Sequence, residues 1–567
     1  MRKIRTPVIV LLGCLAIFRI GAEASGATAP KAAVASAHPA ATAAGRAVLE
    51  AGGNAFDAAI AVAAALAVVE PYSSGIGGGA FFLVHRADDG KTTMIDARER
   101  APGASTHDMY LDEAGEFVRA RALNGPLAAG IPGTPAGLVH LAENYGRLPL
   151  SESLAHAVRL ANDGFALTPR YVRMAGFRKQ AFVDQGHGAE IFLGEDGEPT
   201  LGEIVRQPDL ARTLLALGDR GFAGFYDGDV AEKLVTGMRA DGGIWTRDDL
   251  KDYRVVEREP IVANYAGTRI VSAPPPSSGG VVMAEAFHIL GEFDLGAMDP
   301  DTRRHVVIEA MRRAYRDRAE YLGDPDFVDI PVARLVSPAY GRELAADLSL
   351  ETATPSESLR PLEPEKGRDT THFSVLDRAG NRVAATLSVN YPFGACYVPD
   401  GTGVLLNNEM DDFSARPMTP NAYGLVGVAA NAIAPGKRPL SSMTPTFLES
   451  PDKVGILGTP GGSRIITMVM IGILEFIAGR DPEAWVGAKR FHHQYLPDEV
   501  QYEKGGLTAS EQASLTTRGH TLRELTRNYG NMHAILWNRV TGDVTAASDP
   551  RGEGEAAVFA APVPAQR

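Results

Sequence analysis

A polar stretch near the middle of the chain constrains the fold more than any other feature of the sequence. It covers residues 351–369, reads ETATPSESLRPLEPEKGRD, and contains three prolines among charged and hydroxyl residues. Such a composition cannot bury enough apolar surface to fold by itself, so the sequence predicts an exposed linker before Asp369. Because exposed linkers tolerate a chain break, the chain can be divided here into a large and a small portion.

A β-hairpin is predicted directly after this linker, in RDTTHFSVLDRAGNRVAATLSVN, residues 368–390. Alternation places Phe373 and Val375 on one face of the first strand, and Val383, Ala385, Leu387 and Val389 on one face of the second. The opposite face of the second strand is polar and carries Thr386, Ser388 and Asn390. Because a buried sheet favours apolar side chains, this polar face is expected to line a site.

The remaining sequence predicts helices and paired strands. Two alanine-rich helical stretches lie within residues 39–70, and their small side chains favour close packing against a sheet. Two strand patterns, GGAFFLVHR and TTMIDARER, follow them. Further helices are indicated by the spacing of Ile308, Met311, Tyr315 and Leu322, and by SRIITMVMIGILEFIAG at residues 463–479, which is too short to cross a membrane.

Length and charge exclude some functions. With 567 residues, 45% of them hydrophobic, the chain can bury a large core. Its formal charge is −13, and no basic run appears outside the extreme N-terminus. Phosphate affinity requires clustered lysine and arginine, so no nucleic-acid partner is expected.

The first 24 residues have the layout of a secretory signal peptide. Arg2, Lys3 and Arg5 precede an apolar run over residues 8–18, and small residues surround Ala22. Removing this leader takes away four basic residues and one acidic residue, so the formal charge of −13 becomes −16. We therefore expect an exported protein, periplasmic or secreted.

The two cysteines, Cys14 and Cys396, exclude a disulfide framework once the leader is removed. Leu-Gly-Cys at residues 12–14 also fits a lipoprotein cleavage site, so a tethered form stays an alternative. An uncleaved anchor is disfavoured, because the apolar run falls well short of the roughly 20 residues that span a bilayer.

Thr370 can carry chemistry if the chain is cut in front of it. An α-amino group has a reference pKa of about 7.7 to 8.0, against about 10.4 for lysine, so more of it is an unprotonated base near neutral pH. A threonine at a new N-terminus thus combines a hydroxyl nucleophile with its general base. Without such a cut, Thr370 and Thr371 are typical strand residues.

The sequence resembles the γ-glutamyltranspeptidase family of the N-terminal-nucleophile hydrolase superfamily, from about Ala33 to Arg551. The resemblance rests on ten blocks in the expected order: GGNAFDAAIAV, GIGGGAFF, IDARERAP, GIPGTPAGL, PPPSSGG, DTTHFSV, LLNNEMDDFS, KRPLSSMTPT, GTPGGSRI and RFHHQYLPDE. So many ordered blocks are far more specific than any single short motif.

This resemblance implies an α+β fold, a four-layer αββα sandwich formed jointly by a large and a small chain. It also implies that one precursor cleaves itself between Asp369 and Thr370. The products are a large chain, residues 25–369, and a small catalytic chain, residues 370–567, which remain together as a heterodimer. No cofactor and no metal are expected.

Two sets of residues are implied to bind the charges of a γ-glutamyl substrate. The set for the α-carboxylate is Arg98, Ser441 and Ser442, since a guanidinium binds carboxylates bidentately and hydroxyls donate hydrogen bonds. The set for the α-ammonium is Asn390, Glu409 and Asp412. Tyr423, in ARPMTPNAYGL, is implied to cover the site as part of a lid loop.

Other interpretations of these residues stay open at this point. Arg98 beside Glu99 and Arg100 is by itself typical of a solvated charged run. Glu409 and Asp412 are acids of the type that binds calcium, although no EF-hand spacing is present.

The catalytic residues implied besides Thr370 are Ser388, Gly461 and Gly462. The two glycines precede a helix, where free amides and the helix dipole favour an oxyanion, although a plain helix-entry turn is the alternative. Ser388 replaces the threonine that is usual in the family, and we expect it to assist the nucleophile at an altered rate.

Motifs of other enzyme classes are absent from the sequence. Gly77, Gly78 and Gly79 lack the Lys-Ser/Thr of a P-loop and a complete GxGxxG spacing, so tight packing is expected of them. No G-x-S-x-G or H-E-x-x-H occurs.

The sequence therefore predicts an enzyme that cleaves glutathione and related γ-glutamyl compounds and passes the acyl group to water, an amino acid or a dipeptide. The alternatives are a glutaryl or cephalosporin acylase of the same fold and a catalytically silent, amino-acid-binding homologue.

Overall fold

The computed structural model describes residues 28–194, 196–359, 370–414 and 429–564, and every statement below concerns these residues. The predicted leader with Cys14, the residue Asp369 and the loop residue Tyr423 lie outside them.

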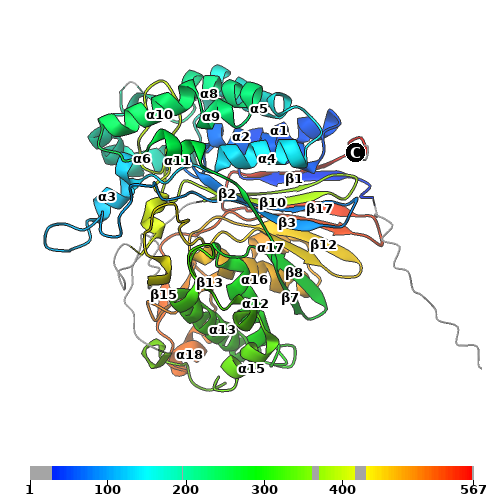
Figure 1. The fold of residues 1–567 in the computed structure, drawn as a ribbon. Helices are drawn as coiled ribbons and strands as arrows, with labels where there is room; N and C mark the ends of the chain where they lie inside the picture. The colour runs from blue at the N-terminus through cyan, green and yellow to red at the C-terminus, as the bar shows by residue number, and fades with distance from the viewer. Residues whose placement is uncertain (1–27, 195, 360–369, 415–428, 565–567) are drawn as a thin grey trace, which may run out of the picture.

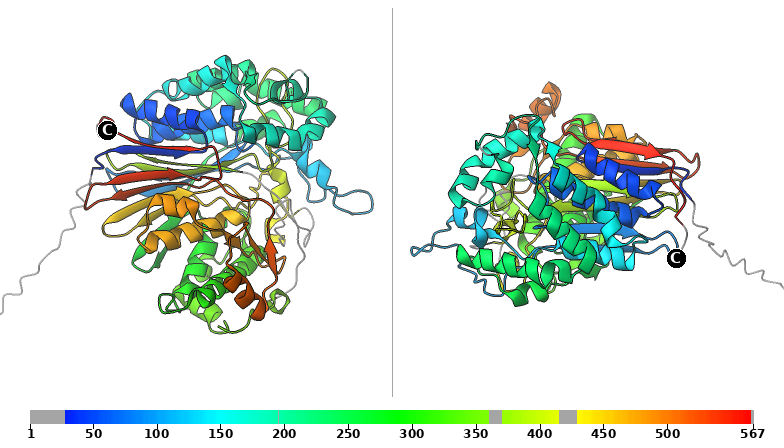
Figure 2. Two further views of the ribbon diagram at one scale, coloured as in Figure 1. Left: turned by 180° about the vertical axis from the view of Figure 1, so that it is seen from behind. Right: turned by 90° about the horizontal axis from the view of Figure 1, so that it is seen from above.

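Two stacked β-sheets form the centre of the molecule, and helices cover the outer face of each sheet (Figure 1). The first sheet has seven strands in the order β18-β1-β9-β10-β2-β3-β6, and the second has six in the order β17-β16-β12-β11-β8-β7. β12 packs against β9 and β10 of the other sheet. The same layers are visible from behind (Figure 2, left). The expected four-layer αββα architecture is confirmed.

The strands of the first sheet are β1 (Ala32–Ser36), β2 (Gly79–His85), β3 (Thr92–Ala97), β6 (Val256–Arg258), β9 (Thr371–Leu376), β10 (Arg382–Ser388) and β18 (Glu555–Phe559). Those of the second sheet are β7 (Ile261–Tyr265), β8 (Thr268–Ser272), β11 (Thr446–Glu449), β12 (Lys453–Gly458), β16 (His533–Asn538) and β17 (Val544–Ser548). Two small sheets lie outside this core and contain β4 (Phe165–Ala166), β5 (Ile204–Val205), β13 (Phe491–His492), β14 (Val500–Tyr502) and β15 (Leu522–Glu524).

The helices divide between the two outer layers and the surface. The layer over the first sheet is built on α1 (Pro39–Glu50), α2 (Ala55–Val69), α4 (Thr134–Asn144), α5 (Leu150–Asp163) and α8 (Pro208–Arg220). The layer over the second is built on α12 (Gly279–Leu290), α13 (Pro300–Tyr321), α15 (Pro338–Ala345), α16 (Arg464–Ile477) and α17 (Pro482–Gly487). The other α-helices are α3 (Arg119–Leu123), α6 (Pro169–Gln185), α7 (Ala189–Phe192), α9 (Ala223–Tyr226), α10 (Asp229–Ala240), α11 (Arg247–Lys251), α14 (Val332–Leu335) and α18 (Ala509–Thr517).

The predicted hairpin is present as β9 and β10. Phe373 pairs with Ala385 and Val375 with Val383, so the apolar residues share one face as expected. This face joins the hydrophobic cluster beneath α1 and α2. In the neighbouring strand β2, Phe82 and Val84 join the same cluster, whereas Phe81 and Leu83 join the cluster between the sheets. The first sheet is therefore buried on both faces.

The alanine-rich helices lie as close to their neighbours as their composition predicts. All residues of α2 are buried, and Asn54 and Asp57 form a capping box at its start. A Cβ on Gly45 of α1 would lie 2.6 Å from Cγ2 of Val62, so only a glycine permits this approach of the two helices.

The two helices predicted farther along the chain are also present. Ile308, Met311 and Tyr315 are buried in α13, and residues 463–479 contain α16, which is buried along most of its length. Within the described residues no helix is long and apolar enough to span a bilayer.

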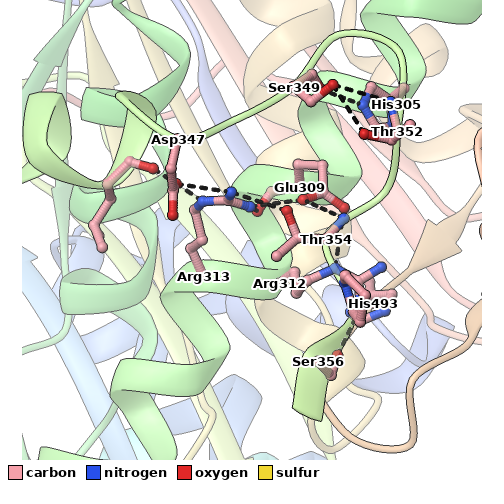
Figure 3. A network of polar contacts seen from close by, with 12 residues as sticks. His305, Glu309, Arg312, Arg313, Asp347, Ser349, Thr352, Thr354, Ser356 and His493 are labelled. Atoms are coloured by element: carbon pink, nitrogen blue, oxygen red, sulfur yellow. Dashed lines mark hydrogen bonds and ion pairs between the residues drawn. The ribbon is translucent and has the colours of Figure 1, made fainter. Parts of the chain in front are cut away.

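The first part of the predicted linker is not exposed throughout, which corrects the expectation for residues 351–359. Ser356 is fully buried, and its hydroxyl donates to the carbonyl of Tyr495 at 2.7 Å. Arg312 donates to the same hydroxyl at 2.6 Å, and the amide of Thr354 reaches Glu309 at 3.3 Å (Figure 3). Polar groups of α13 thus bind this segment, although its composition excludes it from an apolar core.

Candidate active site

Strand register brings the predicted catalytic residues to one edge of the first sheet. Thr371 pairs with Leu387, and Ser388 pairs with Gly79. Ala80 in turn pairs with Ala97, which directly precedes Arg98. The same edge therefore holds Thr370 directly before β9, Ser388 at the end of β10 and Arg98 directly after β3.

The second sheet presents its site residues at this edge as well. β11 begins at Thr446, four residues after Ser442, and Thr446 pairs with Leu457 near the end of β12. The loop after β12 carries Gly461 and Gly462 into α16. The two sheets thus supply opposite walls of one site.

A small cavity lies between these walls. The predicted residues that line it are Thr370, Ser388, Asn390, Glu409, Asp412, Ser441, Ser442 and Gly462. Arg98 and Gly461 do not line it, but Arg98 contacts Glu409 and Asp412, and Gly461 adjoins Gly462. Residues far apart in the sequence therefore converge on Thr370, as a reaction centre requires.

Thr370 is nearly enclosed, with 4% of its surface exposed. The hydroxyl of the next residue, Thr371, donates to the buried carboxylate of Glu70 at 2.7 Å, which fixes the start of the strand. The hydroxyl oxygen of Ser388 accepts the amide of Asn390 at 2.7 Å, so its proton remains for donation elsewhere.

The glycine-rich segment before β2 serves close packing, as expected. A Cβ on Gly78 would lie 2.0 Å from the carbonyl oxygen of Ser388, and one on Gly77 would lie 2.1 Å from that of Leu405. These glycines allow the backbone that carries Ser388 to lie directly against β2.

Arg98 is fully buried, so its interpretation as part of a solvated run is wrong. Its guanidinium forms ion pairs with Glu409 and with Asp412, the latter at 2.6 Å, and lies 3.3 Å from Glu99. Its Nε donates to the carbonyl of Pro439 at 3.2 Å. Glu409 and Asp412 are thus already paired with a cation of the protein.

Three carboxylates share this one guanidinium, and burial shifts the pKa of two of them, Glu99 and Glu409. Burial raises the pKa of Glu99 to about 7, against the opposing charge of Arg98. Burial likewise raises the pKa of Glu409 above its ordinary value. Burial alone would lower the pKa of Arg98, but the charges of Glu409, Glu99 and Asp412 outweigh it and raise that pKa.

Asn390 is the remaining candidate for binding the α-ammonium, and its backbone conformation sets the direction of its side chain. Asn390 has a φ of +71°, in the left-handed region that asparagine tolerates better than most residues. Its side-chain amide donates to the carbonyl of Asn408 at 2.9 Å, directly before the 3₁₀ turn Glu409–Asp412. Asn390 is therefore tied to the turn that carries both acids.

The two serines keep a proton for a ligand. Ser441 Oγ accepts the amide of Met443 at 3.0 Å, and Ser442 Oγ accepts a guanidinium N–H of Arg318 at 3.2 Å. Because each oxygen is already an acceptor, each O–H can donate into the cavity.

The turn before α16 presents two consecutive glycines with positive φ, +142° at Gly461 and +58° at Gly462. Their carbonyls accept the amides of Arg464 and Ile465. In the part of the chain that the structure describes, no acceptor takes the amide proton of either glycine. Two amides at a helix N-terminus beside Thr370 suit an oxyanion.

One predicted member of the polar face does not belong to the site. Thr386 Oγ1 lies 2.9 Å from Nδ1 of His372, buried between the sheets. Burial lowers the pKa of His372 well below its ordinary value, so this histidine is neutral. The polar face of β10 therefore lines the site only at its end, through Ser388 and Asn390.

The sequence interpretation missed three buried polar residues around the cavity: Glu70, Ser278 and Arg318. Arg318 had a detectable signal, because it stands three residues after Tyr315 and four before Leu322, on the apolar face of α13. A cation on such a face indicates a buried role. Glu70 and Ser278 gave no comparable signal.

A cluster of His305, Glu309 and His520 could hold a metal by residue type. Hydrogen bonds already satisfy these groups: Arg312 donates to His520 Nδ1, and His520 Nε2 lies 2.7 Å from His305 Nδ1. His305 Nε2 lies 2.8 Å from the carbonyl of Ser349 (Figure 3). Glu309 also pairs with two arginines, whose charge opposes a cation. The residues do not fit a metal.

A much larger cavity lies elsewhere in the described part of the chain. It has a volume of about 990 Å³ and is lined by residues from β7, α12, α13 and α16, including Phe287, Arg303 and Leu474. It contains none of the residues named above around Thr370. The candidate site is therefore identified by the side chains that line its cavity and not by the volume of that cavity.

A threonine directly before a central strand of an αββα sandwich, in a cavity that a glycine turn at a helix N-terminus also lines, is typical of an N-terminal-nucleophile hydrolase. Comparison with known proteins agrees. The family model described as Gamma-glutamyltranspeptidase matches residues 41–559. The chain belongs to the γ-glutamyltranspeptidase family.

Individual relatives cover most of the chain. It is 43% identical to a glutathione hydrolase proenzyme of Pseudomonas sp. (strain A14), over 83% of each chain. It is 41% identical to the glutathione hydrolase proenzyme of Escherichia coli (strain K12), over 91% of this chain and 90% of the relative. A solved structure of a cephalosporin acylase from Bacillus halodurans is 30% identical, with a TM-score of 0.83 over 94% of this chain and 96% of the acylase.

Proposed function

We propose that the protein is a self-cleaving γ-glutamyltransferase and hydrolase whose nucleophile is Thr370. The observation that carries this proposal is the convergence of Thr370, two acids, two serines and a glycine amide on one cavity. Glutathione and other γ-glutamyl compounds are the proposed donors, as the names of the relatives suggest.

The proposed reaction has two steps. After cleavage of the Asp369–Thr370 bond, the hydroxyl oxygen of Thr370 attacks the γ-carbonyl carbon, and the α-amine of Thr370 takes the hydroxyl proton. The amides of Gly461 and Gly462 stabilise the oxyanion, and the proton passes to the leaving amine. Water, an amino acid or a dipeptide then attacks the γ-glutamyl-threonine ester and restores Thr370.

The charges around the cavity suit both ends of a γ-glutamyl group. A bound substrate would place its α-ammonium against Glu409 and Asp412, and its α-carboxylate against Arg98, Ser441 and Ser442. Arg98 would then exchange contacts with the two acids for contacts with the carboxylate, so every buried charge keeps a partner.

Turnover of two anilides tests the substrate. We expect γ-glutamyl p-nitroanilide to be hydrolysed with a higher kcat/KM than glutaryl p-nitroanilide, because the glutaryl group lacks the ammonium that Glu409 and Asp412 would bind. The reverse preference would support the acylase alternative. The similarity to the cephalosporin acylase is the reason to test that alternative.

Electrophoresis with N-terminal sequencing of the smaller chain tests the nucleophile. The wild-type protein is expected to give a small chain that begins at Thr370. Thr370→Ala should stay uncleaved and inactive, whereas Thr370→Ser, which keeps a hydroxyl, should still cleave. An uncut, inactive wild-type chain would instead support a silent binding protein.

We also propose that the protein is exported to the periplasm or the medium. It is supported by the basic and apolar pattern of the first 24 residues. The heterodimer of chains 25–369 and 370–567 is likewise proposed, together with Tyr423 as a cover of the site.

A further inference from the structure

Arg318 is a buried cation beside the cavity whose partners are hydroxyl groups. Only 4% of its surface is exposed. Its Nε donates to Ser278 Oγ at 2.9 Å, and its Nη2 donates to Ser442 Oγ at 3.2 Å. Within the described part of the chain no carboxylate forms an ion pair with it, in contrast to Arg98 with its three acids.

Keeping such a charge in the protein interior is costly. Burial lowers the pKa of Arg318 to about 10, and the nearby Tyr315 and Asp412 offset only part of this effect. The guanidinium is nevertheless protonated at neutral pH. A buried cation without an anionic partner destabilises a fold, so an anion that enters the cavity would relieve this cost.

The hydrogen bonds of Arg318 fix how two serines orient. Because Ser442 Oγ accepts from Arg318, the Ser442 O–H is left to donate, and Ser442 lines the cavity. Ser278 Oγ also accepts from Arg318 and donates to the carbonyl of Ser441 at 2.8 Å. One guanidinium thus holds both residues of the Ser441–Ser442 pair.

We propose that Arg318 is a positioning residue for the α-carboxylate of the substrate: it orients the Ser442 hydroxyl as a donor, holds the backbone of Ser441 through Ser278, and supplies a buried positive charge behind the two serines. This inference rests on the proposed function. Arg318 acts through the serines, whereas Arg98 is the cation proposed above to bind the carboxylate directly.

Three anilides separate this role from a purely structural one. In Arg318→Gln we expect the KM for γ-glutamyl p-nitroanilide to rise about tenfold or more, because Ser442 loses the charged donor that orients its hydroxyl. The glutaryl compound keeps the carboxylate and should be affected equally. The 4-aminobutyryl compound lacks the carboxylate, so its kinetic constants, or its inhibition constant where turnover is slow, should change less than about twofold.

A double-mutant cycle tests the route through Ser442. Arg318→Gln in a Ser442→Ala background should raise KM clearly less than it does in the wild-type background. Arg313→Gln is the matched control, because Arg313 is an equally buried arginine of α13 that pairs with Glu309 away from the cavity. It should leave the ratio between the substrates unchanged.

The outcomes distinguish the inference from the proposed function. A wild-type protein that does not hydrolyse the γ-glutamyl anilide overturns the proposed function. If the wild type is active and Arg318→Gln affects all three compounds alike, the inference is wrong. If Arg318→Gln does not fold, Ser278→Ala removes one hydroxyl only and must show the same carboxylate-dependent rise in KM, or the inference fails.

Discussion

Ser388 is a hydroxyl at the edge of a sheet for which we propose a role in catalysis other than that of the nucleophile. It pairs with Gly79, accepts the amide of Asn390 and lines the cavity with Thr370. Its remaining proton can donate toward the nucleophile. Sequence alone identified Ser388 and Asn390 by alternation, but it also included Thr386, because alternation cannot tell where along a strand the neighbouring sheet ends.

Substitution of Ser388 tests this role. Ser388→Ala should lower kcat for the γ-glutamyl anilide by at least about tenfold, because a group that assists proton transfer typically contributes 10²–10⁴-fold. Ser388→Thr keeps the hydroxyl and should retain most of kcat. The measurement is steady-state kinetics on fully cleaved protein, and an alanine variant as active as the threonine variant would contradict the role.

At the scale of single residues, the property hardest to predict from the sequence was which charged side chains are buried. Arg98, Glu99 and Arg100 read as a solvated run, yet Arg98 and Glu99 are fully buried. The partners of Arg98 come from residues 409 and 412, which only the fold brings near. Long-range ion pairs of this kind leave no local pattern. The family resemblance singled out Arg98, Glu409 and Asp412 as binders of substrate charges, but it did not predict that they pair with one another.

At the scale of helices and strands, the turn into α16 has two requirements. Its backbone conformation favours glycine, and its proposed role needs an amide that can bind an oxyanion. Gly462 has a φ of +58°, and an L-residue there costs about 1–2 kcal/mol. The sequence predicted both the helix and the turn, since a glycine pair before an apolar run is a local signal. It could not show that the turn faces Thr370.

Gly462→Ala should therefore destabilise the protein modestly and lower kcat by about 10²–10³-fold if the strain displaces the oxyanion donor. Gly479→Ala is the matched control, because Gly479 follows the same helix with a φ of +78° and has open space around its missing Cβ. It should show a similar loss of stability, measured by urea unfolding, with kcat unchanged. Equal kcat values for the two variants would remove the oxyanion role of Gly462.

Two buried histidines near Arg312 of α13, His493 and His520, should make stability depend on pH. Burial lowers the pKa of His520 to about 3 and that of His493 to about 4, from an ordinary value of 6.5. The unfolded chain therefore binds more protons below pH 6.5, and the free energy of unfolding should fall as pH drops from 6.5 toward 4, by up to about 1.4 kcal/mol per pH unit for each group.

Urea unfolding at pH 7.5, 6.5, 5.5 and 5.0 measures this slope. Glu309 has a pKa lowered to about 2, so its own loss of stability begins only below about pH 4.5 and does not overlap. His520→Asn should flatten the slope between pH 6.5 and 5.0, whereas substitution of the exposed His107 to Asn should leave it unchanged. An unaltered slope in His520→Asn would show that the histidine titrates freely.

At the scale of the whole molecule, the order of strands interleaves the two proposed chains. In the first sheet the strands β18, β9 and β10 come from residues after Thr370, and β1, β2, β3 and β6 come from residues before it. Hydrogen-bonded pairs between the two portions are β1 with β18, β1 with β9, β10 with β2, and β11 with β8. The linker composition suggested two separable portions, but the sheets show that neither portion has a complete core.

The chains should therefore separate only when the whole molecule unfolds. After cleavage, gel filtration should give a single peak that contains both chains, because parting them would break the first sheet at three of its pairings and the second at one. In a urea series, loss of circular dichroism, loss of activity and separation of the chains should share one midpoint. Separation of the chains at a urea concentration that leaves the circular dichroism intact would contradict this, because it would require each portion to keep its strands ordered without the hydrogen bonds that the other supplies.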